Sequence, residues 1–177
     1  MLSNLEMLQK VWEWSKEKVT REEINNNLLL GTDNEGRTAW HLVAKWGNLE
    51  GLQKEWYWAN EELTTEEIKS KVLLARDDEG RKVFHVAARR DRQKVLGQLL
   101  DWAIEKLTTE EISNNLLLAT DDKGRTVFHM AVKWGGLEFL QKVWEWANEK
   151  LTSEELNNIL LLATDDEGRT VFHMAAK

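Results

Sequence analysis

The apolar residues of the chain recur with the spacing of a helix face. One run places Leu49, Leu52, Trp56, Ala59 and Leu63 in alternating three- and four-residue steps. That spacing puts the five side chains on one side of a helix of about four turns, with polar residues on the other side. We therefore predict a long amphipathic helix beginning near residue 48.

A tight turn and a shorter helix precede this long helix. Asp33 and Gly36 suit a turn, because a carboxylate can accept nearby backbone N–H groups and glycine tolerates a positive φ. Thr38 can then cap a helix over residues 39–46, and Gly47 can end it in the left-handed region.

A third, short helix is predicted after the long one. Thr64 and Glu67 match a capping box, in which the hydroxyl and the later carboxylate each accept a backbone N–H of the first turn. Residues 72–74 follow either as the end of this helix or as an extended connection to the next turn at Asp77.

The whole pattern returns every 44 residues. The four histidines keep this step, at His41, His85, His129 and His173. Residues 115–133 and 159–177 differ at only three positions. We expect a single repeat array over residues 1–177, with complete units at 33–76, 77–120 and 121–164 and partial units at 1–32 and 165–177.

The spaced residues of the unit resemble the ankyrin repeat. In the first complete unit they are Asp33, Gly36, Thr38, His41, Ala44, Gly47, Leu49 and Glu50. An ankyrin unit has about 33 residues, so this one has about 11 more, which a lengthened second helix and the third helix would take up. The proline that follows the family's threonine is Ala39 here, and the threonine itself is Lys82 in the next unit. The resemblance implies an all-α solenoid of about four units, each with a turn, a short helix, a long helix and a short extra helix.

Composition narrows the function classes. Hydrophobic residues make up 42% and charged residues 31% of the chain, which predicts a folded, soluble protein. No apolar run could span a membrane, and no secretory signal is present, so we expect an intracellular protein although the compartment is left open. The net charge of −7 argues against binding nucleic acid.

No pattern of catalytic residues is present. The histidines would lie about 10 Å apart in neighbouring units, too far to share a metal ion. The resemblance implies instead that each one bonds backbone at the turn and ties neighbouring units. The acidic pairs beginning at Asp77, Asp121 and Asp165 lack the ligand order of a calcium loop and suit turns. We expect no enzymatic activity, no cofactor and no metal site.

Nine of the ten tryptophans fall into three groups, and the tenth, Trp40, lies within the predicted first helix. We predict that the first group and the residue in register with it are core, namely Trp12, Trp56, Trp144 and Leu100. We predict packing also for the indoles two residues later, Trp14, Trp58, Trp102 and Trp146. For Trp46 and Trp134, at the end of the first helix, binding and packing roles both remain open.

The resemblance implies that the chain binds another protein through a concave face built from turn tips and first-helix ends. The candidate contact residues are Asn34, Glu35, Arg37, Lys45, Trp46, Asp78, Glu79, Arg81, Arg89, Arg90, Asp122, Lys123, Arg125, Lys133, Trp134, Asp166, Glu167 and Arg169. The basic residues near Arg89 and Arg90 could receive a carboxylate-rich partner or a phosphate, or they could form a solvated face offset by nearby acids.

Two alternatives to partner binding stay open. The array begins within a second helix and stops on a first helix, so it is either a piece of a longer array or a unit that stacks head to tail with other copies. The absence of proline and cysteine also fits an engineered scaffold without an evolved ligand.

Overall fold

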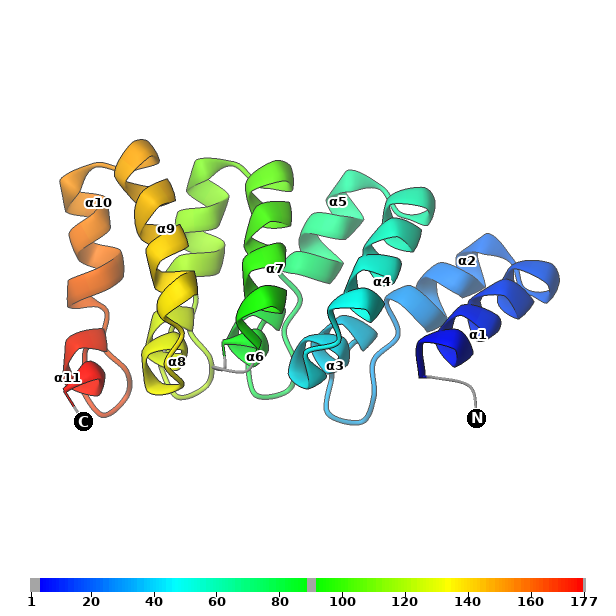
Figure 1. Ribbon diagram of the computed structural model, residues 1–177, viewed down its shortest axis with the longest axis horizontal. Helices are drawn as coiled ribbons and strands as arrows, with labels where there is room; N and C mark the ends of the chain where they lie inside the picture. Colours follow the sequence, from blue (N-terminus) through cyan, green and yellow to red (C-terminus); the bar gives the residue numbers. More distant parts are fainter. Residues whose placement is uncertain (1–3, 89–91, 177) are drawn as a thin grey trace.

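The computed structural model describes residues 4–88 and 92–176, and this part of the chain is almost entirely helical. Its β pairing consists of isolated bridges beside the turns, the first of which joins Thr32 and Thr38. The predicted all-α class is therefore confirmed. In Figure 1 the helices stand side by side in a row that follows the chain from one end to the other.

The order of the elements repeats along the row. The first elements are α1 (Asn4–Lys18), α2 (Arg21–Glu23) and the π-helical segment η1 (Ile24–Leu29). They are followed by α3 (Ala39–Trp46), α4 (Leu49–Glu62), α5 (Thr65–Glu67) and η2 (Ile68–Leu73), then by α6 (Val83–Ala87), α7 (Gln93–Lys106) and η4 (Glu111–Leu117). The last are α8 (Val127–Lys133), α9 (Leu137–Lys150), α10 (Ser153–Asn157), η5 (Asn158–Leu162) and α11 (Val171–Ala175). The short helices α3, α6, α8 and α11 lie along one edge of the row together with the turns (Figure 1).

The helix ends form where the sequence places them. Thr38 is the N-cap of α3, and Gly47 ends that helix with a φ of 70° in the left-handed region. Thr64 and Glu67 form the predicted capping box at the start of α5, with the Thr64 N–H donating to the Glu67 carboxylate over 3.0 Å. These local signals fix the boundaries because each satisfies backbone groups that the helix leaves unpaired.

The predicted third helix continues from α5 into a π-helical turn. After α5, the backbone N–H of Leu74 reaches back five residues to the Lys69 carbonyl, over 3.0 Å, and the same pattern ends η1 at Leu30. Val72 and Leu73 belong to this π-helical turn and are buried, so they are helical rather than extended.

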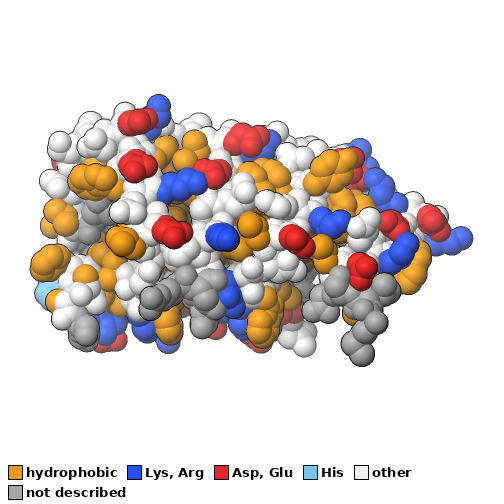
Figure 2. Space-filling view, in the orientation of Figure 1, with side chains coloured by type: hydrophobic (Ala, Val, Ile, Leu, Met, Phe, Trp, Pro, Cys, Tyr) orange, Lys and Arg blue, Asp and Glu red, His pale blue; other side chains and the backbone are white. Residues whose placement is uncertain are grey.

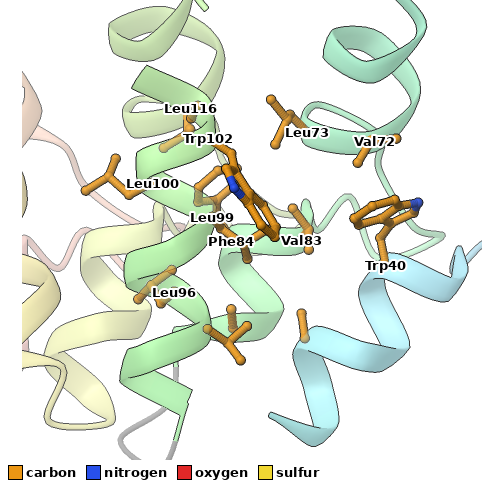
Figure 3. Packing of buried hydrophobic residues seen from close by; sticks show 14 of the residues in the cluster. Trp40, Val72, Leu73, Val83, Phe84, Leu96, Leu99, Leu100, Trp102 and Leu116 are labelled. Atoms are coloured by element: carbon orange, nitrogen blue, oxygen red, sulfur yellow. The ribbon is translucent and has the colours of Figure 1, made fainter. Parts of the chain in front are cut away.

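The core runs between the units as one continuous cluster. Trp40, Phe84 and Phe128 hold the same place in successive first helices and are fully buried. Figure 3 shows Trp40 and Phe84 among side chains from neighbouring helices. Phe172 has the same place in α11 but is 75% exposed, because no described element covers that side of the row.

Stacked indoles join the long helices. Trp12 of α1 stacks on Trp58 of α4, with ring centroids 4.5 Å apart, and Trp56 of α4 stacks on Trp102 of α7 at 4.2 Å. In both pairs, the first-group indole of one unit meets the second-group indole of the next. Such offset stacks add to the area that the rings bury.

Two predictions about tryptophan were wrong. Trp144 was predicted to be core but is 52% exposed, and Trp14 was predicted to pack but is 61% exposed. We call the pairing of a first-group indole with the second-group indole of the next unit the stacking rule, and it gives the reason. Trp144 faces the side that a following unit would cover, and Trp14 faces the side that a preceding unit would cover.

Candidate functional site

Each turn is built around an aspartate and an arginine four residues apart. Asp33 accepts the backbone N–H groups of Glu35 and Arg37 at 2.9 and 3.0 Å, and its second oxygen accepts the Arg37 Nε–H at 2.8 Å. The Arg37 guanidinium lowers the pKa of Asp33 to about 2. The same bonds recur at Asp77, Asp121 and Asp165. The arginine of each turn therefore has a structural role, because it is hydrogen-bonded to the aspartate of the same turn.

Neighbouring turns are bonded to each other. The backbone N–H of Asp78 donates to the Glu35 carbonyl over 3.0 Å, and the equivalent bonds are Asp122 to Glu79 and Asp166 to Lys123. Gly36 has a φ of 68°, and a Cβ added to it would collide with the Asp78 carboxylate. The turns thus form a continuous edge with little space between them.

The histidines also join one unit to the next. His41 Nδ1 contacts the Thr38 hydroxyl at 2.9 Å, while its Nε2 lies 3.2 Å from the Arg81 carbonyl of the following unit. His129 makes the same kind of link, to the Arg169 carbonyl, whereas His85 contacts the Ala119 carbonyl within its own unit, 77–120. The predicted tie between units is therefore confirmed for His41 and His129, and for His85 only the predicted bond to backbone is confirmed. Burial lowers the pKa of His85 to about 4, so this ring is neutral at physiological pH.

A groove crosses the edge formed by the turns and the first helices. It has a volume of about 220 Å³, and its lining residues come from three successive units: Arg37, Lys45, Arg81, His85, Val86, Arg125, Met130 and Trp134. Five of them are predicted contact residues, namely Arg37, Lys45, Arg81, Arg125 and Trp134. The structure therefore brings together candidates that lie up to 97 residues apart in the chain.

The other predicted contact residues lie around this groove. Those at the turn tips are exposed: Asn34, Glu35, Asp78, Glu79, Asp122, Lys123, Asp166 and Glu167. Glu35 and Glu79 each pair with the arginine of their own turn. Lys133 and Arg169 line a separate hollow beside α11. Trp46 is 70% exposed at the end of α3, and Arg89 and Arg90 lie outside the described residues.

The indole in the groove is partly covered. Trp134 is 39% exposed, and the Lys133 ammonium lies 5.4 Å from the centre of its ring. Met130 provides an apolar surface on the same wall. Trp134 and Met130 can contact an apolar residue of a partner, and the Lys133 ammonium next to them can contact an acidic one.

Three basic residues of the cluster near Arg89 and Arg90 donate hydrogen bonds to backbone carbonyls within the molecule. Arg76 donates to the carbonyls of Gly80 and Thr120, the Lys82 ammonium donates to the Asn115 carbonyl, and Arg92 donates to the Lys45 carbonyl. Burial and the nearby Arg76 charge lower the pKa of Lys82 to about 8. The Arg76 and Arg92 bonds join units 33–76 and 77–120, and the Lys82 bond lies within unit 77–120. All of them favour the structural interpretation of the cluster.

Sequence reasoning missed one residue, Glu55. It is 4% exposed on α4, and burial raises the pKa of its carboxyl to about 8. The signal was present in the repeat, because the residues 44 positions away on either side are Val11 and Leu99, and the next is Val143. A single acid at a position that is aliphatic in every other unit is a departure that the core must accommodate.

The described residues contain no cluster of acidic, histidine or cysteine side chains that could hold a metal ion. Nor does the described part of the chain include a helix both long and apolar enough to cross a membrane. Comparison with protein-family models finds no match for the chain, and comparison with curated proteins finds no relative.

Proposed function

We propose that the chain is an ankyrin-like helical solenoid of about four 44-residue units that binds another protein through the groove at its turn edge. The observation that carries this proposal is the groove itself, in which Arg37, Arg81 and Arg125 line up from three units beside Lys45 and Trp134. Tryptophan and arginine are the residue types that most often anchor protein interfaces.

The charges of the groove point to an extended segment of mixed charge. Each lining arginine is already bonded to the aspartate of its turn, so its charge is partly neutralised. Lys45 and the remaining guanidinium N–H groups can receive carboxylates of the partner, while Met130 and Trp134 can receive an apolar side chain. We therefore infer a partner segment that carries one aromatic or aliphatic residue with acidic residues next to it.

Selection of peptides from a displayed random library on the immobilised chain tests this proposal. We expect the selected peptides to be rich in aspartate and glutamate around one apolar residue. Trp134→Ala and Lys45→Ala should each weaken their binding by about tenfold or more, because each removes an anchor of the groove. Trp14→Ala is the matched control, since it removes an exposed indole far along the chain.

Two results would contradict the proposal. One is a selection that yields no peptide with saturable binding, which would favour a scaffold without a ligand. The other is binding that Trp14→Ala weakens as much as Trp134→Ala does, which would place the contact surface elsewhere.

A second candidate function is head-to-tail self-association, which the exposed indoles favour. Trp144 lacks the second-group indole that Trp12 and Trp56 each have, and Trp14 lacks the first-group indole that Trp58 and Trp102 have. A stack of Trp144 on Trp14 of another copy would repeat the stack that joins the units within one chain. Leu161, Leu162 and Phe172, which lie with Trp144 in the last elements of the row, are also exposed. Figure 2 shows hydrophobic side chains at that end of the row.

Light scattering over a range of concentrations tests this candidate. Self-association predicts a mass that rises with concentration, and Trp144→Ala or Trp14→Ala should abolish the rise. A mass that stays at that of one chain at every concentration would refute it.

A further inference from the structure

A second cavity lies at the start of the row, where α1, η1, α3 and α4 meet. It shares no lining residue with the groove and has a volume of about 80 Å³. Three indoles line it, Trp12, Trp40 and Trp58, together with aliphatic side chains of neighbouring helices. Val11, at its edge, is 46% exposed, so the cavity is reached from the surface of α1.

Glu55 supplies the single ionisable group among the described residues of this lining. Its Oε2 atom is fully buried and has no hydrogen-bond partner among the described residues. Buried polar atoms are nearly always hydrogen-bonded, and leaving one unpaired is unfavourable. Because Glu55 lines the cavity, a ligand in the cavity could donate a hydrogen bond to this oxygen.

The size of the cavity limits the occupant. Its volume is about half of the roughly 150 Å³ that a cavity needs to hold benzene, so it takes a group of about three or four non-hydrogen atoms. The apolar walls exclude a strongly hydrated ion, because such an ion would lose its water without replacement.

The charge of the occupant follows from the carboxyl. Burial holds the proton on Glu55 and raises its pKa to about 8. A cation beside the carboxyl would take the place of that proton and favour the ionised form. Indole rings also attract ammonium groups more strongly than other aromatic side chains do.

We propose that this cavity binds a small alkylammonium group, which donates an N–H to Oε2 of Glu55 and places its methyl groups against Trp12, Trp40 and Trp58. The group can belong to a free amine or to the end of a methylated lysine side chain. On binding, the carboxyl releases its proton to solvent and forms an ion pair with the ammonium.

Titration with trimethylammonium chloride, followed by indole fluorescence and by amide shifts in NMR spectra, tests the proposal. We expect saturable binding with shifts at α1 and α4. 2-Propanol is the matched neutral probe, since it has the same four non-hydrogen atoms around one branched centre and one donor but no charge, and it should bind on the order of tenfold more weakly or worse. Binding of trimethylammonium should strengthen as the pH rises towards about 8 and then level, because the carboxyl must lose its proton.

Two variants separate the carboxyl from the cavity. Glu55→Gln keeps the shape and removes the charge, and Glu55→Leu repeats the residue found at Leu99 in the next unit. Both should remain folded, as judged by circular dichroism, and both should lose the binding. A capped dimethyllysine tested in parallel distinguishes the two sources. Tight binding of the amino acid indicates a side-chain ligand, and binding of trimethylammonium alone indicates a free amine.

Three results would overturn the proposal: no saturable shift with either cation, equal affinity for 2-propanol and trimethylammonium, or unchanged binding in Glu55→Gln. Because the cavity and the groove have separate linings, none of these results bears on the peptide selection described above.

Discussion

Replacement of Glu55 by leucine should stabilise the protein, and the gain should depend on pH. In the folded protein the pKa of this carboxyl is about 8 instead of the ordinary 4.5. At about 1.4 kcal/mol per pH unit, this rise corresponds to on the order of 5 kcal/mol of unfavourable free energy once the group must ionise. The aliphatic residues at the equivalent positions, Leu99 and Val143, show that the site accommodates such a side chain.

The direction of the pH dependence follows from the protons bound. Between about pH 4.5 and 8 the folded state keeps the proton of Glu55 while the unfolded state has lost it, so the free energy of unfolding falls as the pH rises through this range. Glu55→Leu removes that fall. We expect the variant to gain about 1 to 3 kcal/mol near pH 5, from the unpaired oxygen alone, and several kcal/mol more near pH 9.

Urea unfolding at a series of pH values, followed by indole fluorescence, measures the difference. Leu99→Glu is the reciprocal variant, because it places the same acid at the equivalent position of the next unit and should introduce the same loss of stability at high pH. If the unfolding free energies of the parent and of Glu55→Leu differ by a constant amount from about pH 5 to 9, the carboxyl is not buried in the folded protein and the reasoning fails.

Three further predictions concern a buried histidine, the turns and the stacked indoles. The parent should lose on the order of 3 kcal/mol of unfolding free energy as the pH falls from about 6.5 towards 4, because the buried His85 ring resists protonation. His85→Asn should remove this loss, and identical acid unfolding of both proteins would contradict the prediction. Gly124→Ala should lower the melting temperature more than Gly168→Ala, because both have a positive φ but only the first would also collide with a neighbouring aspartate; equal shifts would show that the turns do not pack as described. Trp102→Ala should cost about 3 to 5 kcal/mol of unfolding free energy and Trp144→Ala less than about 1, and a reversed order would refute the stacking rule.

Local signals in the sequence were enough to locate most helix boundaries. Thr38, Gly47 and the Thr64 capping box act through backbone groups within a few residues, so their effect does not depend on the rest of the fold. The π-helical turn at Val72 was not predictable in this way. It adds one residue between bonded groups, and the packing of Val72 and Leu73 against the next unit decides it.

The predictions that failed depended on neighbours. The face that Trp144 presents is the same as that of Trp12, yet one is exposed and the other buried, since only Trp12 has a described unit over it. For the candidate site, the resemblance indicated five of the eight groove residues, whereas it gave His85 a structural role and did not indicate Val86 or Met130. It did not indicate that the arginines would be bonded to Asp33 and its equivalents, because a pair four residues apart meets only when the turn between them closes.

The stacked indoles also bear on how the chain avoids folding in the wrong order. Units this similar could pair with the wrong neighbour during folding, a characteristic failure of repeat proteins. The contact between long helices is not the same at each step, however: the first-group position holds Trp12, then Trp56, then Leu100, and Glu55 marks one unit alone. If a unit packed against a unit that is not its neighbour in the sequence, an indole would lack its stacking partner or Glu55 would face the apolar core of another unit. The sequence differences between the copies thus make the interfaces between units chemically distinct, whereas identical repeats would form identical interfaces.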